Sequence, residues 1–314
     1  MLTAFSWKEV KMIRSAMCAA VALLSLLRAL PGAAVERELD SHEYKMLLMP
    51  SLFAGEPNSD MVNRVWTGKI RDRLAAVDGV KLNDKDFAHD KTRWVKFRDI
   101  RGECFLWNND YILRERTKLE DGEPKTPKAT LKYRHEKKAM AAAVHLNGDD
   151  AKFEEDVGLT MSKTDGEKRR YSLSGKVKLE DGEVVSLADL KKLFPRFEET
   201  FPAVRDRDDG LETVSGLTIT ERVFEGPVLE LGGAKVEADA TVSLWYRPDG
   251  SDVGELLLAE FSFGYKRRNH GAADLKEADT VGVKALETLI PLMTESSVGT
   301  KTRSIYELDD FCDD

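Results

Sequence analysis

Two pairs of cationic residues in the sequence share a spacing that could gather positive charge on one side of a strand. Arg114 and Arg116 are two residues apart, and so are Lys132 and Arg134. Because successive side chains of a strand point to opposite faces, the members of each pair share a face. Arg binds phosphate oxygens through a planar bidentate fork, and Lys adds a point charge. The two pairs are therefore candidate ligands for a phosphorylated compound.

The ordinary explanation of such a pattern is a half-buried strand whose polar face is in solvent. Two features argue against it: cations dominate the polar face of successive strands, and amphipathic helices are available to cover the apolar face. A sheet curled with its polar face inward and helices outside would give this pattern. Packed like charges repel, so we expect acidic side chains or a bound anion to offset them.

Four short segments, in chain order, resemble strands of the CYTH (triphosphate tunnel) superfamily, which includes thiamine triphosphatase, inorganic triphosphatases and class IV adenylate cyclase. Residues 41–45, Ser-His-Glu-Tyr-Lys, are similar to its opening Glu-x-Glu-x-Lys motif. Residues 113–116, Leu-Arg-Glu-Arg, look like its Leu-Arg-x-Arg strand, and residues 129–134 like the Thr-Leu-Lys strand that follows. Residues 152–156 resemble the next strand, where basic and acidic residues alternate.

The resemblance continues to Arg222, in the position of a basic strand, and to Glu260, in the position of an acidic late strand. It implies an α+β fold that is mainly antiparallel β, an eight-stranded tunnel or barrel with flanking helices. In this family Lys and Arg bind a triphosphate while carboxylates hold Mg²⁺ or Mn²⁺. The residues implied are Lys45 for catalysis, Arg114, Arg116, Lys132, Arg134 and Arg222 for the substrate, and Glu43, Glu154 and Glu260 for the metal.

The sequence departs from the family pattern at its carboxylates. Ser41 stands where the opening motif has its first Glu, and Glu260 is followed by Ser262 in place of a second late Glu. Hard divalent cations need several oxygen ligands, so the metal site should be weakened. Further carboxylates that could serve as ligands or support them are Asp156, Glu237 and Asp239.

Three classes of function remain open at this point. The first is a metal-dependent phosphohydrolase acting on an inorganic or organic triphosphate, in which positioning and charge neutralisation carry the catalysis. The second is a noncatalytic receptor for a phosphorylated small molecule or inorganic polyphosphate, with a degenerate metal site. The third is an interaction protein whose tunnel is filled by its own side chains.

Alternation of apolar and polar residues predicts the strands that must position these side chains. Turn chemistry separates several of them and favours antiparallel pairing. Periodicity of the helical kind, with capping residues Ser59 and Ser186, predicts three helices near 59–77, 186–194 and 272–290. The predicted strands lie near 41–48, 91–99, 110–118, 128–136, 151–157, 169–178, 217–224, 236–247 and 255–266.

Composition excludes several classes of protein. The formal net charge is −8, which argues against nonspecific binding to nucleic acid or anionic membranes, because that binding needs a broad positive surface. The sequence contains no P-loop, no Gly-x-Gly-x-x-Gly fingerprint and no Gly-x-Ser-x-Gly elbow. Its five histidines show no metal-ligand spacing. Any anion site must be a local concentration of cations.

The first residues, 1–34, have the order of a secretory signal. A basic stretch precedes the apolar run 16–27, and Gly32 and Ala34 stand at −3 and −1 to a cut before Val35. The alternative is an uncleaved anchor, but the run is shorter than the ~20 residues of a span. We therefore expect a secreted, periplasmic or otherwise extracytoplasmic protein with no stable membrane span after the signal is removed.

The mature chain is expected to form one domain at 40–305, followed by an acidic tail at 306–314. Cys104 and Cys312 could form one bridge in an oxidising compartment. The favoured interpretation is a semi-buried Cys104 and a loose Cys312 in that tail. Residues 300–303, Thr-Lys-Thr-Arg, could bring cations to the mouth of the tunnel, although a solvated chain end is the favoured interpretation.

Overall fold

The computed structural model describes residues 37–146, 151–159, 167–180, 182–250, 253–268, 270–294, 301–308 and 310–312. These all belong to one compact unit, Arg37–Asp314. The expected secretory signal, 1–34, lies outside the described residues.

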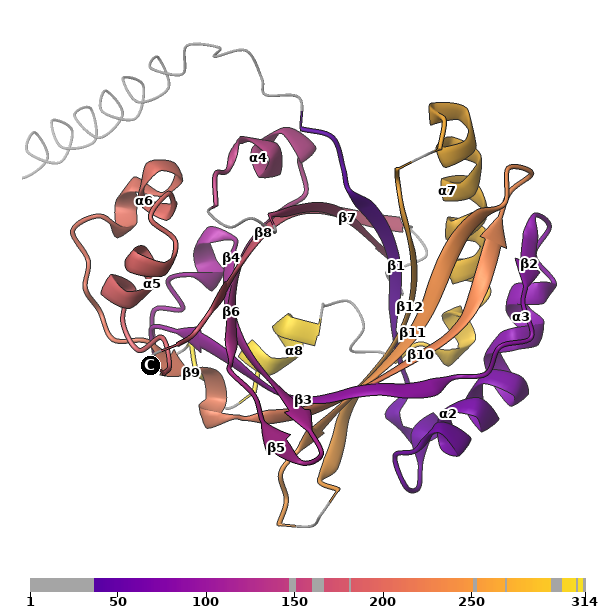
Figure 1. Ribbon diagram of the computed structural model, residues 1–314, viewed down its shortest axis with the longest axis horizontal. Coiled ribbons are helices and arrows are strands. Elements are labelled where there is room, and N and C mark those ends of the chain that lie inside the picture. The colour runs from indigo at the N-terminus through magenta and orange to yellow at the C-terminus, as the bar shows by residue number, and fades with distance from the viewer. Residues whose placement is uncertain are drawn as a thin grey trace, which may run out of the picture. The chain divides into compact units, whose positions relative to one another are not determined.

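Within the described residues, a mainly antiparallel sheet of 12 strands rings a tunnel-like space (Figure 1). Nine strands follow one another round the ring in the order β10-β11-β12-β1-β7-β8-β6-β4-β3, and a further pairing of β3 with β10 closes it. The β1–β7 pair is parallel, and the other strand pairs of the ring are antiparallel. Their bounds are β1 Ser41–Leu48, β3 Ala88–Asp99, β4 Tyr111–Glu120, β6 Lys128–His135, β7 Lys152–Leu159, β8 Glu167–Lys178, β10 Ile219–Leu231, β11 Val236–Arg247 and β12 Glu255–Lys266.

The nine strands predicted from alternation are the nine strands of the ring, whereas the eight strands implied by the family resemblance are too few. Three more strands extend the sheet: β2 (Val80–Leu82), β5 (Glu123–Pro124) and β9 (Glu212–Thr213). They have two or three residues each, too few to show a period in the sequence. The largest error in length is at β10, which continues past the predicted end near 224 through a bulge between Glu225 and Val228.

Helices cover the outer, apolar face of the ring, except the last one of the chain, which lies at the tunnel (Figure 1). The predicted 59–77 helix is α2 (Ser59–Val65) and α3 (Arg71–Ala75) joined by one π-helical turn at Trp66–Ile70. Its cap is Asn58, whose side chain accepts from Met61 N, and not Ser59 as predicted. The Ser186 cap is confirmed, because its Oγ accepts from Asp189 N. The remaining helices are α4 (Lys138–Ala143), α5 (Leu187–Leu193), α6 (Phe197–Thr200), α7 (Ala272–Glu287) and α8 (Lys301–Tyr306).

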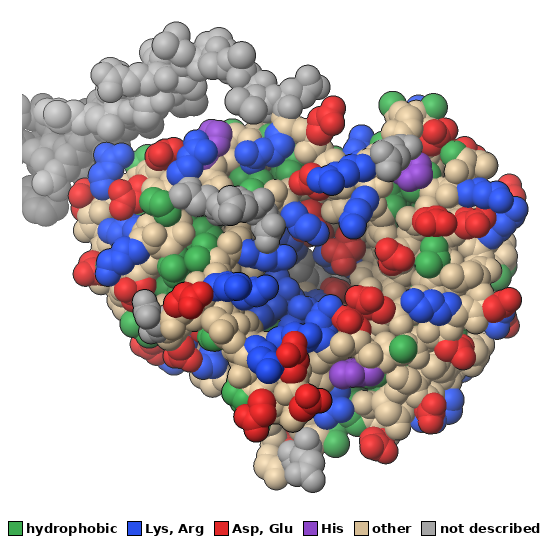
Figure 2. All heavy atoms as spheres, in the orientation of Figure 1, with side chains coloured by type: hydrophobic (Ala, Val, Ile, Leu, Met, Phe, Trp, Pro, Cys, Tyr) green, Lys and Arg blue, Asp and Glu red, His purple; other side chains and the backbone are tan. Residues whose placement is uncertain are grey.

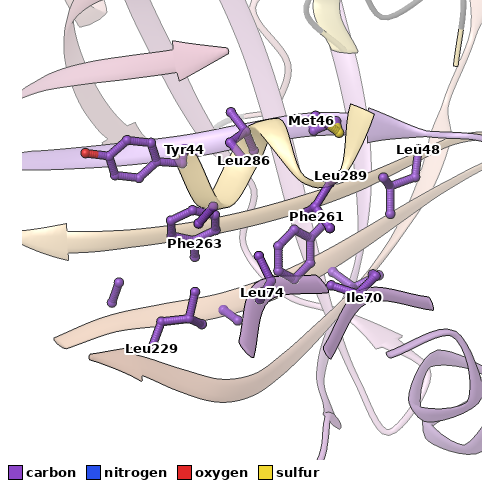
Figure 3. Close-up of a cluster of buried hydrophobic side chains, with 14 of the residues drawn as sticks. Tyr44, Met46, Leu48, Ile70, Leu74, Leu229, Phe261, Phe263, Leu286 and Leu289 are labelled. Carbon is purple, nitrogen blue, oxygen red and sulfur yellow. The ribbon is translucent and has the colours of Figure 1, made fainter. Parts of the chain in front are cut away.

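The largest hydrophobic cluster lies between the outer face of β1 and β10–β12 and the helices α2, α3 and α7 (Figure 3). Phe261 and Phe263 of β12 are fully buried in it. Burial of a Phe side chain contributes roughly 1.5–3 kcal/mol. The close approach of α7 requires Gly282, since a Cβ there would lie 2.6 Å from Tyr44 Cζ. This packing holds the apolar residues of β1 outward and so turns Glu43 and Lys45 inward.

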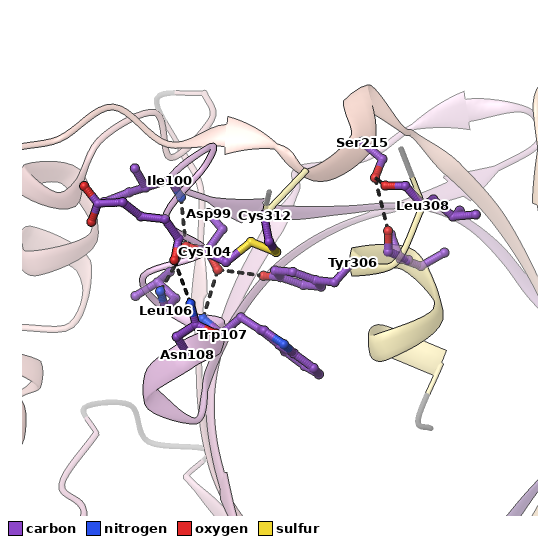
Figure 4. The surroundings of a disulfide bond; sticks show 12 residues. Asp99, Ile100, Cys104, Leu106, Trp107, Asn108, Ser215, Tyr306, Leu308 and Cys312 are labelled. Atoms are coloured by element: carbon purple, nitrogen blue, oxygen red, sulfur yellow. Dashed lines mark hydrogen bonds between the residues drawn. A yellow bond between two sulfur atoms is a disulfide. The ribbon is translucent and has the colours of Figure 1, made fainter. Parts of the chain in front are cut away.

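The C-terminal segment is bound to the end of the ring, and the interpretation of Cys312 as loose is wrong. Cys312 forms a disulfide with Cys104, in the loop between β3 and β4 (Figure 4). Phe311 is fully buried beside it, and its carbonyl accepts from Gly102 N at 3.0 Å. Tyr306 donates to the buried Asp99 carboxylate at 3.1 Å. These two buried aromatic residues anchor the C-terminal segment, although its acidic composition predicts a solvent-exposed tail.

No helix in the described part of the chain is long and apolar enough to span a membrane.

Removing the disulfide should destabilise the fold. Cys104 and Cys312 are 208 residues apart, so the bridge restricts a large part of the unfolded chain. We expect Cys312→Ser to lower the free energy of unfolding by about 2–4 kcal/mol, measured by urea denaturation without reductant. With reductant, the parent chain should fall to the stability of the variant. Equal stability of the oxidised and reduced parent would contradict the disulfide.

Candidate functional site

A cavity of about 460 Å³ lies inside the ring of strands. Lys and Arg side chains gather round the hollow at the centre of the ring, with acidic side chains along one side (Figure 2). The lining contains ten Lys or Arg residues and five Glu residues, but Trp245 is its only aromatic residue among those described. The enclosed space is therefore suited to a compact, highly charged anion.

The four cations singled out in the sequence all line this cavity. Arg114 and Arg116 project from β4, and Lys132 and Arg134 from β6. Leu113 and Leu131, the alternating neighbours, are fully buried in the cluster under α5 and α6 on the outer face. The predicted convergence of the four cations is confirmed, because alternation on two paired strands leaves no other arrangement once the leucines face the helices.

Lys45, Glu43, Glu154 and Glu260 also line the cavity. They come from strands that meet at β1: Ser41 pairs with Glu154 and Glu43 with Asp156 across the parallel β1–β7 pair. On the other side of β1, Leu47 pairs with Glu260 of β12.

Asp156 organises one cluster of cations in the tunnel. Its Oδ1 lies 2.8 Å from Lys45 Nζ, and its Oδ2 lies 2.6 Å from Arg134 Nη2 and 3.9 Å from Lys132 Nζ. Burial alone would raise the pKa of Asp156, but the charges of Lys45, Lys132 and Arg134 hold it well below its usual range. The carboxylate is therefore ionised and serves as the fixed counter-ion of these three cations.

Glu221 of β10 organises a second cluster, which the sequence analysis did not identify. Its fully buried carboxylate is paired with Arg93, and Oε2 lies 3.7 Å from Arg116 Nε while Oε1 lies 3.7 Å from Lys301 Nζ. Burial would raise the pKa of Glu221, but Arg116, Arg93 and Lys301 hold it well below its ordinary value. Alternation in 217–224 puts Glu221 on the same strand face as Ile219 and Val223. Both faces of this strand mix apolar and charged residues, so the pattern did not indicate which face is turned to the tunnel.

The placement of Arg222 in the site is wrong. Strand alternation puts its neighbours Glu221 and Val223 in the cavity lining and turns Arg222 to the opposite face. There its Nη1 donates to the carbonyl of Pro57 at 3.3 Å. The basic residue that lines the tunnel opposite Glu221 is Arg93 of β3, its partner in the strand register.

The interpretation of 300–303 as a solvated end is wrong for two of its residues, while Thr300 lies outside the described residues. Lys301 and Thr302 of α8 line the cavity. Lys301 Nζ lies 2.7 Å from Glu260 Oε1 and 4.9 Å from the centre of the Trp245 ring. The sequence could not show this, because the position of α8 depends on contacts made by Tyr306, Phe311 and the disulfide.

The carboxylates of the tunnel do not fit the expected Mg²⁺ or Mn²⁺ site. Among the described residues, no group of three or more His, Cys, Asp or Glu side chains could hold a metal ion. Glu237 and Asp239 are exposed and do not line the cavity. Each predicted metal ligand is paired with a Lys side chain instead: Glu43 with Lys45 at 2.7 Å, Glu154 with Lys132 at 3.6 Å and Glu260 with Lys301 at 2.7 Å.

Arg114, unlike the cations of the two clusters, has no carboxylate partner among the described residues. Within the described part of the chain it makes neither a hydrogen bond nor an ion pair, and its Nε is buried without a partner. Burial, and then the charge of Arg93, lower the pKa of Arg114 to about 10. The guanidinium is thus held between the two clusters without a counter-ion of its own.

No protein-family model and no curated protein matches this chain. Several solved structures are similar to it. An adenylyl cyclase candidate from Hippeastrum, reported to have a dominant triphosphatase activity, is 11% identical, with 85% of this chain and 95% of that chain covered and a TM-score of 0.37. A protein from Pyrococcus horikoshii OT3 is 12% identical, with 79% and 88% covered and a TM-score of 0.30.

An adenylate cyclase candidate from Vibrio parahaemolyticus is 9% identical, with 86% of this chain and 99% of that chain covered and a TM-score of 0.29. Two of these three proteins are thus described as adenylyl or adenylate cyclase candidates, and one of the two as having triphosphatase activity.

Proposed function

We propose that this chain is an exported protein that binds a triphosphate or another phosphorylated ligand inside the tunnel. The observation that carries the proposal is Arg114, a cation in an enclosed cavity without a counter-ion. Transfer of an unpaired charge out of water costs free energy unless a partner is supplied. A polyanion with several oxygens would supply that partner.

The size and chemistry of the cavity favour a phosphate chain over other anions. Arg114 and Arg116 present guanidinium groups that suit bidentate contacts to phosphate oxygens, and Lys132 adds a point charge. Burial lowers the pKa of Lys132 despite the charges of Asp156 and Glu154. The three cations are therefore less than fully compensated by protein carboxylates, and a bound anion would relieve that imbalance.

The geometry supports binding better than metal-dependent hydrolysis. Lys45 lies between the carboxylates of Glu43 and Asp156, at 2.7 and 2.8 Å, and Lys301 lies between those of Glu260 and Glu221, at 2.7 and 3.7 Å. Two ammonium groups thus fill the spaces between carboxylates that a divalent cation would need. The function is accordingly that of a receptor for a phosphorylated ligand, with Lys45 as a fixed counter-ion and not a catalytic residue.

Export is supported by two observations of different kinds. Basic, apolar and small residues follow one another in 1–34 in the order of a secretory signal. The Cys104–Cys312 disulfide is of the kind that persists mainly in oxidising compartments. In this proposal the ligand is bound in an extracytoplasmic compartment.

Tripolyphosphate should bind without added metal, and Lys132→Ala should weaken binding by about tenfold to a hundredfold, since a charge-assisted hydrogen bond contributes roughly 1.5–3 kcal/mol. Isothermal titration calorimetry in the presence of EDTA measures this directly. The matched control is Lys128→Ala, because Lys128 is on the same strand and face but is exposed and outside the cavity lining. Absence of tripolyphosphate binding to the parent chain would overturn the proposed function.

Replacing Arg114 should weaken the binding of tripolyphosphate but raise the stability of the ligand-free protein. At pH 7 Arg114 is charged in both the folded and unfolded chain, so the folded state carries the whole cost of its burial. Arg114→Met should raise the free energy of unfolding by about 1–2 kcal/mol, measured by urea denaturation, because it removes an uncompensated charge.

The control for this variant is Arg98→Met on the neighbouring strand. Arg98 is also buried, but its Nε and Nη2 each lie 3.2 Å from an oxygen of the buried Glu115. Its removal would leave the buried Glu115 carboxylate without its cationic partner and should destabilise by about 3 kcal/mol. A loss of stability in both variants would mean that Arg114 has a counter-ion in the folded protein.

Export predicts a chain that starts at Val35. Intact-mass spectrometry of the protein recovered from the extracytoplasmic fraction should show loss of residues 1–34. Ala34→Lys should block cleavage, because the −1 position requires a small residue. A recovered parent chain that retains Met1 or Met12 would contradict the proposal.

A further inference from the structure

A second basic cavity adjoins the tunnel. It has a volume of about 410 Å³, and its lining includes Lys152, Lys176, Lys266 and Arg268, here called the basic recess. Lys152 and Lys176 line both this recess and the tunnel cavity. The two cavities thus share a pair of lysines, of which Lys152 opens the segment 152–156 noted in the sequence, while Lys176 was not identified there.

The recess lies at the end of the tunnel away from α8. On the paired strands β1 and β12, Ser41 is opposite Lys266 at one end, and Leu47 is opposite Glu260 at the other. Lys301 of α8 contacts Glu260, whereas Ser41 and Lys266 line the recess. Six residues of extended chain, about 20 Å, separate the two ends.

Positive charge in the recess is poorly compensated. Asp40 is its one acidic lining residue among those described, and Asp40 Oδ2 accepts a hydrogen bond from the backbone N of Phe153 at 2.8 Å. Lys152 lies 3.7 Å from Glu154. The side chains of Lys176, Lys266 and Arg268 are exposed at the surface, and in the described part of the chain no hydrogen bond or ion pair engages them.

The cations of the recess interact electrostatically with those of the tunnel. Burial lowers the pKa of Lys176, and the charges of Lys152, Arg116 and Arg114 lower it further. Lys176 is therefore within electrostatic reach of both tunnel arginines and of Lys152. Lys152 and Lys176 line both cavities, so they are available to an anion that extends from the tunnel into the recess.

We propose that the basic recess is a second anion subsite, which binds the part of a linear inorganic polyphosphate chain that extends beyond the tunnel. This inference rests on the proposed function, because the first phosphates of the chain are held by Arg114, Arg116 and Lys132. It adds a preference for length: a chain longer than a triphosphate gains contacts to Lys266 and Arg268, whereas tripolyphosphate fills the tunnel alone.

The experiment compares two ligands on two variants of the full chain with the disulfide intact. The probes are tripolyphosphate and a linear polyphosphate several times longer, titrated by calorimetry in EDTA at fixed salt. The test variant is Lys266→Gln with Arg268→Gln. The matched control is Lys81→Gln with Lys85→Gln, which removes the same charge from exposed positions outside the recess and the tunnel cavity.

The parent chain should bind the longer polyphosphate more tightly per chain than tripolyphosphate. In the test variant the affinity for the longer chain should fall about tenfold, equivalent to about 1.4 kcal/mol, while the affinity for tripolyphosphate changes less than about twofold. The control variant should match the parent for both ligands. Retained tripolyphosphate binding also shows that the test variant is folded.

The outcomes separate a failure of the proposed function from a failure of the inference about the recess. If the parent does not bind tripolyphosphate, the proposed function fails. If tripolyphosphate binds but the longer chain loses no affinity in the test variant, or loses as much in the control, the recess is not a subsite. If an oligonucleotide competes with the longer polyphosphate as strongly as unlabelled polyphosphate does, the recess is a general site for polyanions and the inference is overturned.

Discussion

The structure depends on the compensation of positive charge inside a closed ring of strands. The tunnel brings together cations that would repel one another strongly at close range. Asp156 and Glu221 make this possible, because each ionised carboxylate is surrounded by three cations that come from at least two different elements of the fold. Arg114 lies between the two clusters and is left without a counter-ion. In the proposed function, a bound anion supplies the counter-ion that Arg114 lacks.

The same pairing of charges is the reason for proposing ligand binding in place of metal-dependent hydrolysis. A divalent cation would have to displace Lys45 or Lys301 from the carboxylates that hold them. Lys301 is brought to the tunnel by α8, and α8 is held by the buried Tyr306, by Phe311 and by the Cys104–Cys312 disulfide. The C-terminal segment thus contributes a fixed positive charge from the protein itself, at a place where the family resemblance implies a metal ion.

Alternation in the sequence was sufficient to predict the nine strands of the ring and the inward direction of Arg114, Arg116, Lys132 and Arg134, because period-2 patterning assigns a face as soon as the leucines are placed in the core. The family resemblance failed at Arg222, because the alternation of this strand turns its neighbours Glu221 and Val223 to the tunnel. Alternation itself failed for Lys301 and Cys312, since long-range packing of a short helix and a disulfide leaves no periodic signal. Glu221 was missed for a related reason: a fully buried carboxylate can be recognised only when its three cationic partners are known.

If Arg114 and its neighbours form the binding site for a phosphate chain, a crystal structure of the protein with tripolyphosphate should show it. We expect ordered phosphates inside the ring, with oxygens within hydrogen-bond distance of the Arg114 guanidinium and the Lys132 ammonium, and with Lys45 still bound to Asp156. Tripolyphosphate bound only on the outer surface, with Arg114 contacting a protein carboxylate instead, would contradict this expectation.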